Sequence, residues 1–163
     1  MTAYFAYGTT QEGFTHHRAL GLGPRAARVW TVEPYGIVVP LEAGCSNPGC
    51  RYVHRMAALV AGAAPYAEGD LFLEDSFEAL DRLELAGPYV RATVRVSDGS
   101  REWDAVAYPA AEPSRWRALV ASGLGEALGS YAVEADDGLK ECCVRDPGHG
   151  GPHDVVDVLA SAP

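Results

Sequence analysis

The chain has 163 residues, 48% of them apolar, and a formal net charge of −9 at pH 7. This length suits one compact domain with a buried core, and the apolar content argues against disorder over most of the chain. The negative charge repels nucleic-acid backbones and anionic lipid surfaces, and the only lysine, Lys140, belongs to no basic cluster. We therefore expect neither nucleic acid nor a membrane as a partner.

The N-terminal segment gives an expectation about location. No apolar run reaches the roughly 18 residues that span a bilayer. The opening sequence MTAYFAYGTT has no basic region before its apolar residues, unlike a secretory signal. We therefore expect a mature protein that begins near Met1 and stays in the cytoplasm.

The first part of the chain predicts extended segments around one helical turn. Residues 3–7 form a short apolar run, the expected first strand, and the loop GTTQEG follows it. A helical turn is expected over residues 14–20, ended by a cluster of glycines and a proline. Residues 26–39 are expected to be extended, with interruptions at Pro34 and Gly36.

The middle of the chain predicts a strand followed by a helix. The segment RYVHRMAALVAG, within residues 40–66, fits either a short helix or a strand. Residues 69–74 alternate as a strand does. The following helix is expected to be capped by Asp75 or Ser76 and to end at Gly87 and Pro88.

The second half of the chain predicts a hairpin, a helix and a tail. Residues 89–97 alternate between apolar and polar side chains, and DGS at 98–100 forms a turn into the returning strand 101–108. Residues 113–124 predict a helix with a proline in its first turn. Near the C-terminus, VVDVLA is an apolar run that we expect to pair with another segment.

These elements predict the fold class. Several short strands, separated by hairpins and irregular loops, with two or three helices between them, indicate an α+β domain with a small mixed, barrel-like sheet and flanking helices. We expect residues 1–129 to form this domain and residues 130–163 to form a C-terminal extension packed on it.

Glu84 is the strongest functional candidate from its position alone. It falls four residues after Leu80 and seven after Phe77, so all three share one stripe of the predicted helix. A carboxylate on a buried stripe is costly, and burial raises its pKa towards neutrality, which suits a general base. The alternative is an acid at a helix end that reaches solvent.

The loop after the first strand is a candidate ligand site. Gly8 lets the backbone turn sharply and bring main-chain N–H groups close to a ligand. If a helical turn begins near Gln11, these groups lie at its positive end, which attracts anions, and the hydroxyls of Thr9 and Thr10 add donors. The alternatives are that Gly8 only forms a turn and that Tyr7 only packs in the core.

Three segments in this order resemble the gamma-glutamylcyclotransferase-like superfamily. FAYGTT is similar to the family's opening strand and Tyr-Gly-Ser or Tyr-Gly-Thr turn, and AEGDLFLEDSFEALDRLE to its strand, helix and Leu-Asp-x-x-Glu motif. YVRATVRV is similar to the next strand, followed by DAVAY and a tryptophan-bearing helix. The resemblance runs from about Tyr4 to Leu124 and depends on the order and spacing of the segments.

The resemblance implies a fold, an activity and a site. The fold is a small mixed barrel with flanking helices, and the activity is the cleavage of a gamma-glutamyl amide by its own alpha-amine, which releases 5-oxoproline and a free amine or amino acid. The family's catalytic acid corresponds to Glu84, and its substrate loop corresponds to Tyr7, Gly8, Thr9 and Thr10. The partner is then a small gamma-glutamyl molecule, and no cofactor is required.

Departures from the family pattern leave the substrate open. Leu85 follows the catalytic acid where the family often has glycine, and the loop reads Thr9-Thr10 rather than Ser-Asn or Thr-Leu. One version of the function serves glutathione or amino-acid turnover, and another removes a gamma-glutamyl protecting group in a biosynthetic pathway. The alternative from another class is a non-catalytic module on the same fold that binds a small molecule or a protein.

Cysteines and histidines form two clusters that suggest a structural zinc. One cluster is Cys45-x4-Cys50 followed by His54, and the other is Cys142-Cys143 with His149 and His153. The second has Gly and Pro between its Cys and His residues, and its spacing can surround a tetrahedral ion. Four ligands from both clusters would attach the tail to the domain: Cys45, Cys50, Cys143 and His149. The alternatives are free cysteines, which are common in a cytosolic protein, and an ordinary flexible turn.

Overall fold

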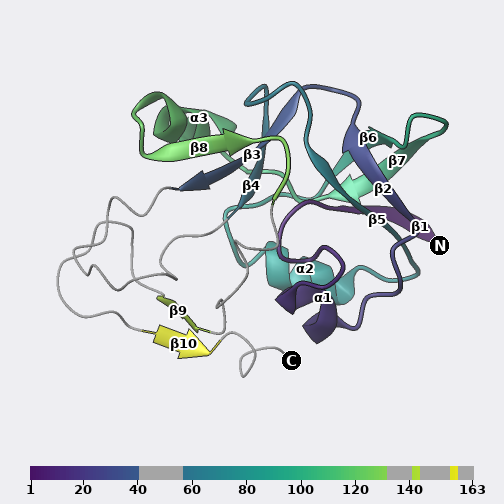
Figure 1. Cartoon of the computed structure of the whole chain (residues 1–163). Helices are drawn as coiled ribbons and strands as arrows, with labels where there is room; N and C mark the ends of the chain where they lie inside the picture. The colour runs from purple at the N-terminus through teal and green to yellow at the C-terminus, as the bar shows by residue number, and fades with distance from the viewer. Residues whose placement is uncertain (41–56, 132–140, 144–154, 158–163) are drawn as a thin grey trace.

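A computed structural model of the chain describes residues 1–40, 57–131, 141–143 and 155–157. Strands dominate these residues, with three short helices between them (Figure 1). The strands are β1 (Thr2–Ala6), β2 (Ala27–Thr31), β3 (Tyr35–Pro40), β4 (Ala58–Ala61), β5 (Glu68–Glu74), β6 (Ala92–Ser97), β7 (Glu102–Ala107), β8 (Gly125–Leu128), β9 (Glu141–Cys143) and β10 (Val155–Asp157), and the helices are α1 (Thr15–Leu20), α2 (Glu78–Glu84) and α3 (Pro113–Ala121).

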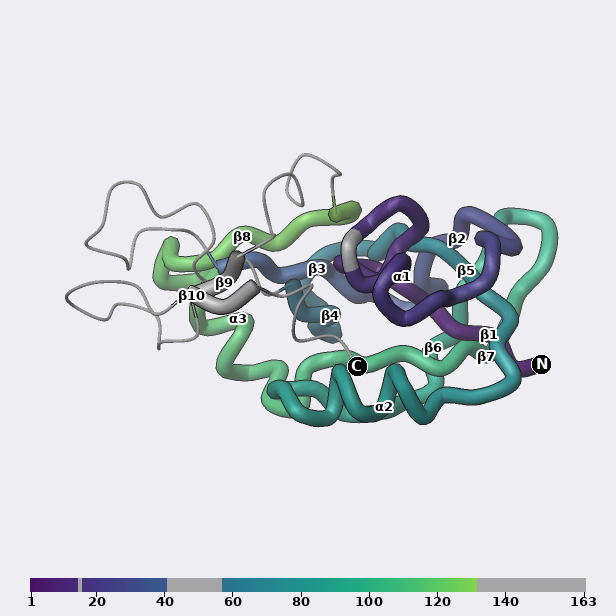
Figure 2. The backbone as a smooth tube through the Cα atoms, turned by 90° about the horizontal axis from the view of Figure 1, so that it is seen from below, coloured from purple at the N-terminus to yellow at the C-terminus, as the bar shows by residue number. Residues whose placement is uncertain are grey.

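Five strands form a closed barrel in the order β1-β5-β2-β6-β7. Its neighbouring strands are antiparallel except where β1 meets β7 in parallel, with Tyr4 opposite Val106. A second sheet has the order β4-β3-β8. Figure 1 shows α1 and α2 below the barrel and α3 beside the second sheet, and the view from below shows α1 and α2 apart from each other (Figure 2). The predicted mixed α+β fold with a barrel-like sheet is confirmed.

Strand β1 is buried on both faces, because the barrel core covers its inner face and the α2 segment covers its outer face. Successive side chains of a strand point to opposite faces. Phe5 joins the core inside the barrel, whereas Tyr4 joins a second cluster with Phe77 and Leu80 of the α2 segment. The Tyr4 and Phe77 rings meet edge to face, with centroids 6.3 Å apart. The apolar stripe of α2 is therefore buried against the outside of β1.

Gly69 allows β1 and β5 to approach each other where the barrel closes. A Cβ atom at this position would lie 2.1 Å from the carbonyl oxygen of Ala6 and 2.6 Å from the Phe5 ring. Neither contact is possible for a real side chain, so only glycine fits between the strands. The residue pairs Ala6–Asp70 and Val29–Gly69 then set the register at the end of β1, where the loop begins.

The second sheet builds its own core against α3. Along β3, Ile37 points into the barrel core, and Val38 points towards Trp116 of α3. Gly36 lies inside β3 instead of interrupting it. A Cβ at this position would lie 2.8 Å from the backbone nitrogen of Ala64, so a larger residue does not fit there. The predicted interruption at Gly36 is therefore wrong. The described part of the segment that fitted either a helix or a strand, from residue 57 on, forms β4.

The predicted cap of α2 is also wrong. The helix begins at Glu78, and its N-cap is Phe77, which makes no side-chain cap hydrogen bond. Ser76 only accepts a hydrogen bond from the Glu78 N–H at 3.4 Å. Burial of the Phe77 ring against Tyr4 places the first turn of the helix, and tertiary packing here outweighs the capping preference.

Parts of the tail and its proposed zinc site lie outside the described residues. These parts include Cys45, Cys50 and His149 and the side chain of Cys143. Among the residues that are described, no group of three His, Cys, Asp or Glu side chains could hold a metal ion, and no helix could cross a membrane. The VVD segment pairs with residues 141–143, as expected of an apolar run. The division at residues 129 and 130 stays a prediction.

Candidate active site

Glu84 is the last residue of α2, one turn after the buried Leu80. Its side chain is half-buried. Within residues 1–40 and 57–131, its carboxylate has no hydrogen-bond or ion-pair partner. Burial raises the pKa of Glu84 from its usual 4.5 to about 7, because loss of water disfavours the charged form. A carboxyl group with this pKa can take up and release a proton near neutral pH.

The surroundings of Glu84 are rich in tyrosine. Burial is the main cause that raises the pKa of each of four phenols, and the negative charge of Glu84 raises each one further. This electrostatic effect requires that the carboxylate lies near all four rings. These tyrosines come from two parts of the chain. Tyr4 and Tyr7 lie in and just after β1, and Tyr89 and Tyr108 lie just before β6 and just after β7.

The phenol protons near Glu84 are directed elsewhere. Three of the hydroxyls donate to other protein oxygens, and the fourth shares a hydrogen bond with a threonine. These pairs are Tyr7 with the Tyr108 carbonyl (2.7 Å), Tyr89 with the Ala57 carbonyl (3.0 Å), Tyr108 with Asp81 Oδ1 (2.6 Å) and Tyr4 with Thr10 Oγ1 (2.8 Å). The phenols therefore exclude water from Glu84 without donating to its carboxylate, which keeps its pKa high.

The loop after β1 folds into a tight turn. The Gln11 N–H donates to the Gly8 carbonyl at 3.1 Å, and the carbonyl of Thr9 accepts the N–H of His16 at 3.1 Å. Within the described part of the chain, the N–H groups of Thr9 and Thr10 donate to no other group. These two adjacent main-chain donors are therefore our candidates for binding an anionic ligand.

The threonine hydroxyls of this loop contact the protein itself. Thr9 Oγ1 lies 2.6 Å from Nδ1 of His16, and Thr10 Oγ1 shares the hydrogen bond with Tyr4. Helix α1 begins at Thr15, not near Gln11, so the loop does not lie at the first turn of a helix. The available donors of the loop are thus its backbone N–H groups rather than hydroxyls or a helix dipole.

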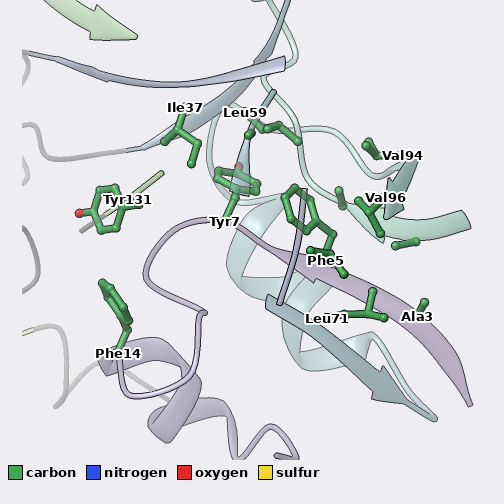
Figure 3. Close-up of a cluster of buried hydrophobic side chains, with 14 residues drawn as sticks. Ala3, Phe5, Tyr7, Phe14, Ile37, Leu59, Leu71, Val94, Val96 and Tyr131 are labelled. Atoms are coloured by element: carbon green, nitrogen blue, oxygen red, sulfur yellow. The ribbon is translucent and has the colours of Figure 1, made fainter. Parts of the chain in front are cut away.

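Tyr7 connects this loop to the site of Glu84. Its ring lies beside the Phe5 ring in the barrel core, with the centroids 6.1 Å apart (Figure 3), and its hydroxyl donates to the Tyr108 carbonyl. The charge of Glu84 raises the pKa of this same phenol. The end of β1 and the end of α2 therefore approach one group of tyrosines.

Comparison with known proteins shows the family of the chain. The model of the family described as "Gamma-glutamyl cyclotransferase, AIG2-like" matches residues 4–124. The chain belongs to this family. Among curated proteins, no match was found.

Several solved structures are similar to this chain, and the first of them shows the fold. The crystal structure of an AIG2-like protein from mouse is similar with a TM-score of 0.60 and 23% identity, over 85% of this chain and 93% of the mouse chain. YkqA from Bacillus subtilis has a TM-score of 0.48 and 18% identity, over 85% of this chain and 52% of its own. A protein from Pyrococcus horikoshii has a TM-score of 0.47 and 18% identity, over 68% and 78%.

In this AIG2-like chain, Asp81 ties α2 to the strand segments beside it. Its carboxylate accepts the Tyr108 hydroxyl and, at 2.8 Å, Nη1 of Arg91. The Arg91 guanidinium also lies over the Phe77 ring, 4.7 Å from its centroid. Sequence reasoning named neither Arg91 nor Asp81 as a site residue, although Asp81 is the aspartate of the Leu-Asp-x-x-Glu motif.

Sequence reasoning also missed Tyr4 and Tyr108 as neighbours of the candidate acid. Both lie in apolar strand segments, where an aromatic residue usually indicates only core. Their phenol groups could have indicated a polar site, since a buried tyrosine needs a hydrogen-bond partner. An excess of tyrosine at the ends of predicted strands near Glu84 would have indicated a site there.

Proposed function

We propose that this AIG2-like protein is a cyclotransferase that cleaves a gamma-glutamyl amide. The observation that supports this most directly is the half-buried carboxyl group of Glu84 with a pKa near 7. The family match over residues 4–124 supports the same class of activity. In this proposal Glu84 is the catalytic residue, and Tyr7, Gly8, Thr9 and Thr10 form the substrate loop.

The reaction needs one base and one set of oxyanion donors. The N–H groups of Thr9 and Thr10 bind an anionic group of the substrate, either its alpha-carboxylate or the oxyanion that develops on the gamma-carbonyl. Glu84 takes a proton from the alpha-ammonium group, and the freed amine attacks the gamma-carbonyl carbon to form the ring C–N bond. Nucleophile and electrophile belong to one molecule, so the enzyme mainly holds a conformation.

Release of the product returns the proton. After the attack the ring nitrogen still carries two protons. The tetrahedral intermediate collapses, the original amide C–N bond breaks, and the proton held by Glu84 moves to the departing amine. The Glu84 carboxylate then passes the second proton of the ring nitrogen to the same amine, which leaves as an ammonium ion. The products are 5-oxoproline and a free amine or amino acid, and Glu84 is again a carboxylate. Every proton in this sequence is moved by the substrate or Glu84, so the step requires no cofactor.

The amine portion defines two versions of the function. In one, the substrate carries an amino acid or peptide, and the protein serves amino-acid or glutathione turnover in the cytoplasm. In the other, the gamma-glutamyl group protects an amine, and the protein removes it late in a biosynthetic pathway. The departures at Leu85 and Thr10 from the usual family pattern favour a specialised substrate.

The test is a panel of gamma-glutamyl amides with different amine portions, with 5-oxoproline as the measured product. We expect turnover of at least one member by the wild-type chain and none by Glu84→Gln. Equal turnover by both proteins would remove Glu84 from the mechanism. Tight binding of panel members without any 5-oxoproline would instead support a non-catalytic binding module.

A further inference from the structure

Two polar side chains lie fully buried behind the candidate substrate loop. Asp70 on β5 and Gln11 in the loop are each only 1% exposed. A buried carboxylate and a buried amide are costly unless their hydrogen bonds are made. Both side chains are directed at the segment from Gly8 to Glu12, and neither contacts Glu84.

Asp70 holds one end of this segment. Its Oδ2 accepts the backbone N–H of Glu12 at 2.8 Å, and its Oδ1 accepts Nη1 of Arg28 at 2.9 Å and Nη1 of Arg25 at 3.2 Å. Hydrogen bonds between charged partners are stronger than neutral ones. The far end of the loop is therefore attached to a barrel strand through its main chain.

Gln11 holds the other end. Its Oε1 accepts Nη1 of Arg28 at 2.9 Å, and its Nε2 donates to the Gly8 carbonyl at 3.3 Å. The same Arg28 nitrogen thus bridges Asp70 and Gln11. The two main-chain groups that are held, the Gly8 carbonyl and the Glu12 N–H, lie on either side of Thr9 and Thr10.

We propose that Asp70, Arg28 and Gln11 form a loop clamp that fixes residues 8–12 and so directs the N–H groups of Thr9 and Thr10 towards the ligand. These three are positioning residues, because they act through the loop backbone. The ligand part of this inference rests on the proposed function. The conformational part concerns the loop itself and is measured without substrate.

The chain offers a matched pair of arginines for the test. Arg28 on β2 and Arg95 on β6 are exposed to a similar extent, with 46% and 51% of the side chain accessible. Each forms ion pairs with two acids, and of the two only Arg28 contacts Gln11 and Asp70. The acids are Glu68 and Asp70 for Arg28, and Glu33 and Glu102 for Arg95. Arg28→Met and Arg95→Met therefore each remove one positive charge of similar exposure, but only Arg28→Met also removes the contacts with Gln11 and Asp70.

Hydrogen exchange of the full-length chain measures the loop directly. The amides of Gln11 and Glu12 are hydrogen-bonded within the turn and to Asp70, so they are protected while the clamp holds. We expect Arg28→Met to speed their exchange about tenfold and to leave barrel amides of β6 and β7 unchanged. Arg95→Met is expected to exchange as the wild type does.

A second variant and a binding measurement complete the test. Gln11→Met removes both side-chain hydrogen bonds without changing charge, and it is expected to speed loop exchange even if Arg28→Met does not fold. Both variants are expected to weaken 5-oxoproline binding about tenfold. For the active panel amide, KM rises if the N–H groups bind the alpha-carboxylate, and kcat falls if they bind the oxyanion. Loop exchange equal to that of Arg95→Met in both would overturn the clamp.

The two proposals fail in different ways. If the wild type binds no 5-oxoproline and turns over no panel member, the proposed function is wrong, whereas faster loop exchange in Arg28→Met still supports the clamp. If turnover is present and loop exchange does not respond to either variant, the clamp is wrong and the cyclotransferase proposal stands.

Discussion

Two acidic side chains, Asp70 and Glu84, are both shielded from water, but within residues 1–40 and 57–131 only Asp70 has hydrogen-bond donors around it. Asp70 is 1% exposed and accepts hydrogen bonds from a backbone N–H and two arginines. Glu84 is half-buried, and within the described part of the chain its carboxylate has no donor at all. The donors around Asp70 hold it in fixed contacts with the chain, whereas burial without donors raises the pKa of Glu84. One acid can therefore hold backbone in place, and the other can move a proton.

The neighbours of each acid explain the difference. Around Asp70 the polar groups are Arg25, Arg28 and Gln11, which point their donors inward. Around Glu84 the polar groups are phenols, and their protons go to other acceptors. Four predictions, from the largest effect to the smallest, test this contrast.

The largest effect is expected at the acid without donors. Glu84→Gln keeps the shape of the side chain but cannot accept the proton of the alpha-ammonium group, so we expect kcat to fall about a thousandfold or more. At pH 5, where Glu84 is protonated in the folded wild type, the circular dichroism spectrum and thermal midpoint should stay close to those of the wild type. Turnover within tenfold of the wild type would show that another group is the base.

The second effect is a pH dependence of stability that belongs to Glu84. Because its pKa is raised from 4.5 to about 7, the folded state keeps a proton that the unfolded state has already released between these values. Stability from this group is therefore present at low pH and falls as pH rises to about 7, by about 3 kcal/mol. Kinetically, kcat/KM should rise with pH up to the same value.

Urea unfolding of wild type and Glu84→Gln at pH 5 and pH 8 measures this effect. The variant is expected to gain stability relative to the wild type between the two pH values, because it lacks the titrating group. All other groups titrate equally in both proteins and cancel. An unchanged difference between the two proteins across this range would contradict the raised pKa.

The third effect is expected at the acid with donors. Asp70→Asn leaves the Glu12 N–H and two arginines without a carboxylate, so we expect a loss of about 2 kcal/mol in the free energy of unfolding. Glu33→Gln is the matched control, since Glu33 pairs with Arg95 on the surface, and it should change stability far less. Equal effects of the two substitutions in chemical denaturation would show that the buried network adds nothing.

The smallest effect is expected at a phenol. Tyr108→Phe removes the hydroxyl that donates to Asp81, while Asp81 keeps its ion pair with Arg91. We expect a loss of about 1 kcal/mol in stability and a change in kcat of less than tenfold. A much larger loss of kcat would mean that the phenol takes part in the chemistry, and the contrast between the two acids would then be incomplete.

Sequence alone determined the main outline of the protein. Alternation and helical spacing predicted the strands at β1, β5, β6 and β7 and the helix that ends at Glu84, because hydrophobic period reflects which face is buried. The order of the three motif segments indicated the family and its fold. The same stripe that places Phe77 and Leu80 in the core also drew attention to Glu84.

Tertiary structure alone decided what surrounds each acid. The tyrosines near Glu84 are far apart in the chain, and only closure of the barrel brings β1 and β7 together. The start of α2 was set by packing of Phe77 rather than by its cap. Asp70, Arg28 and Gln11 likewise meet only because β5 pairs with both β1 and β2. Spacing along a chain describes local geometry, whereas the pKa of an acid and the shape of a loop depend on contacts between distant segments.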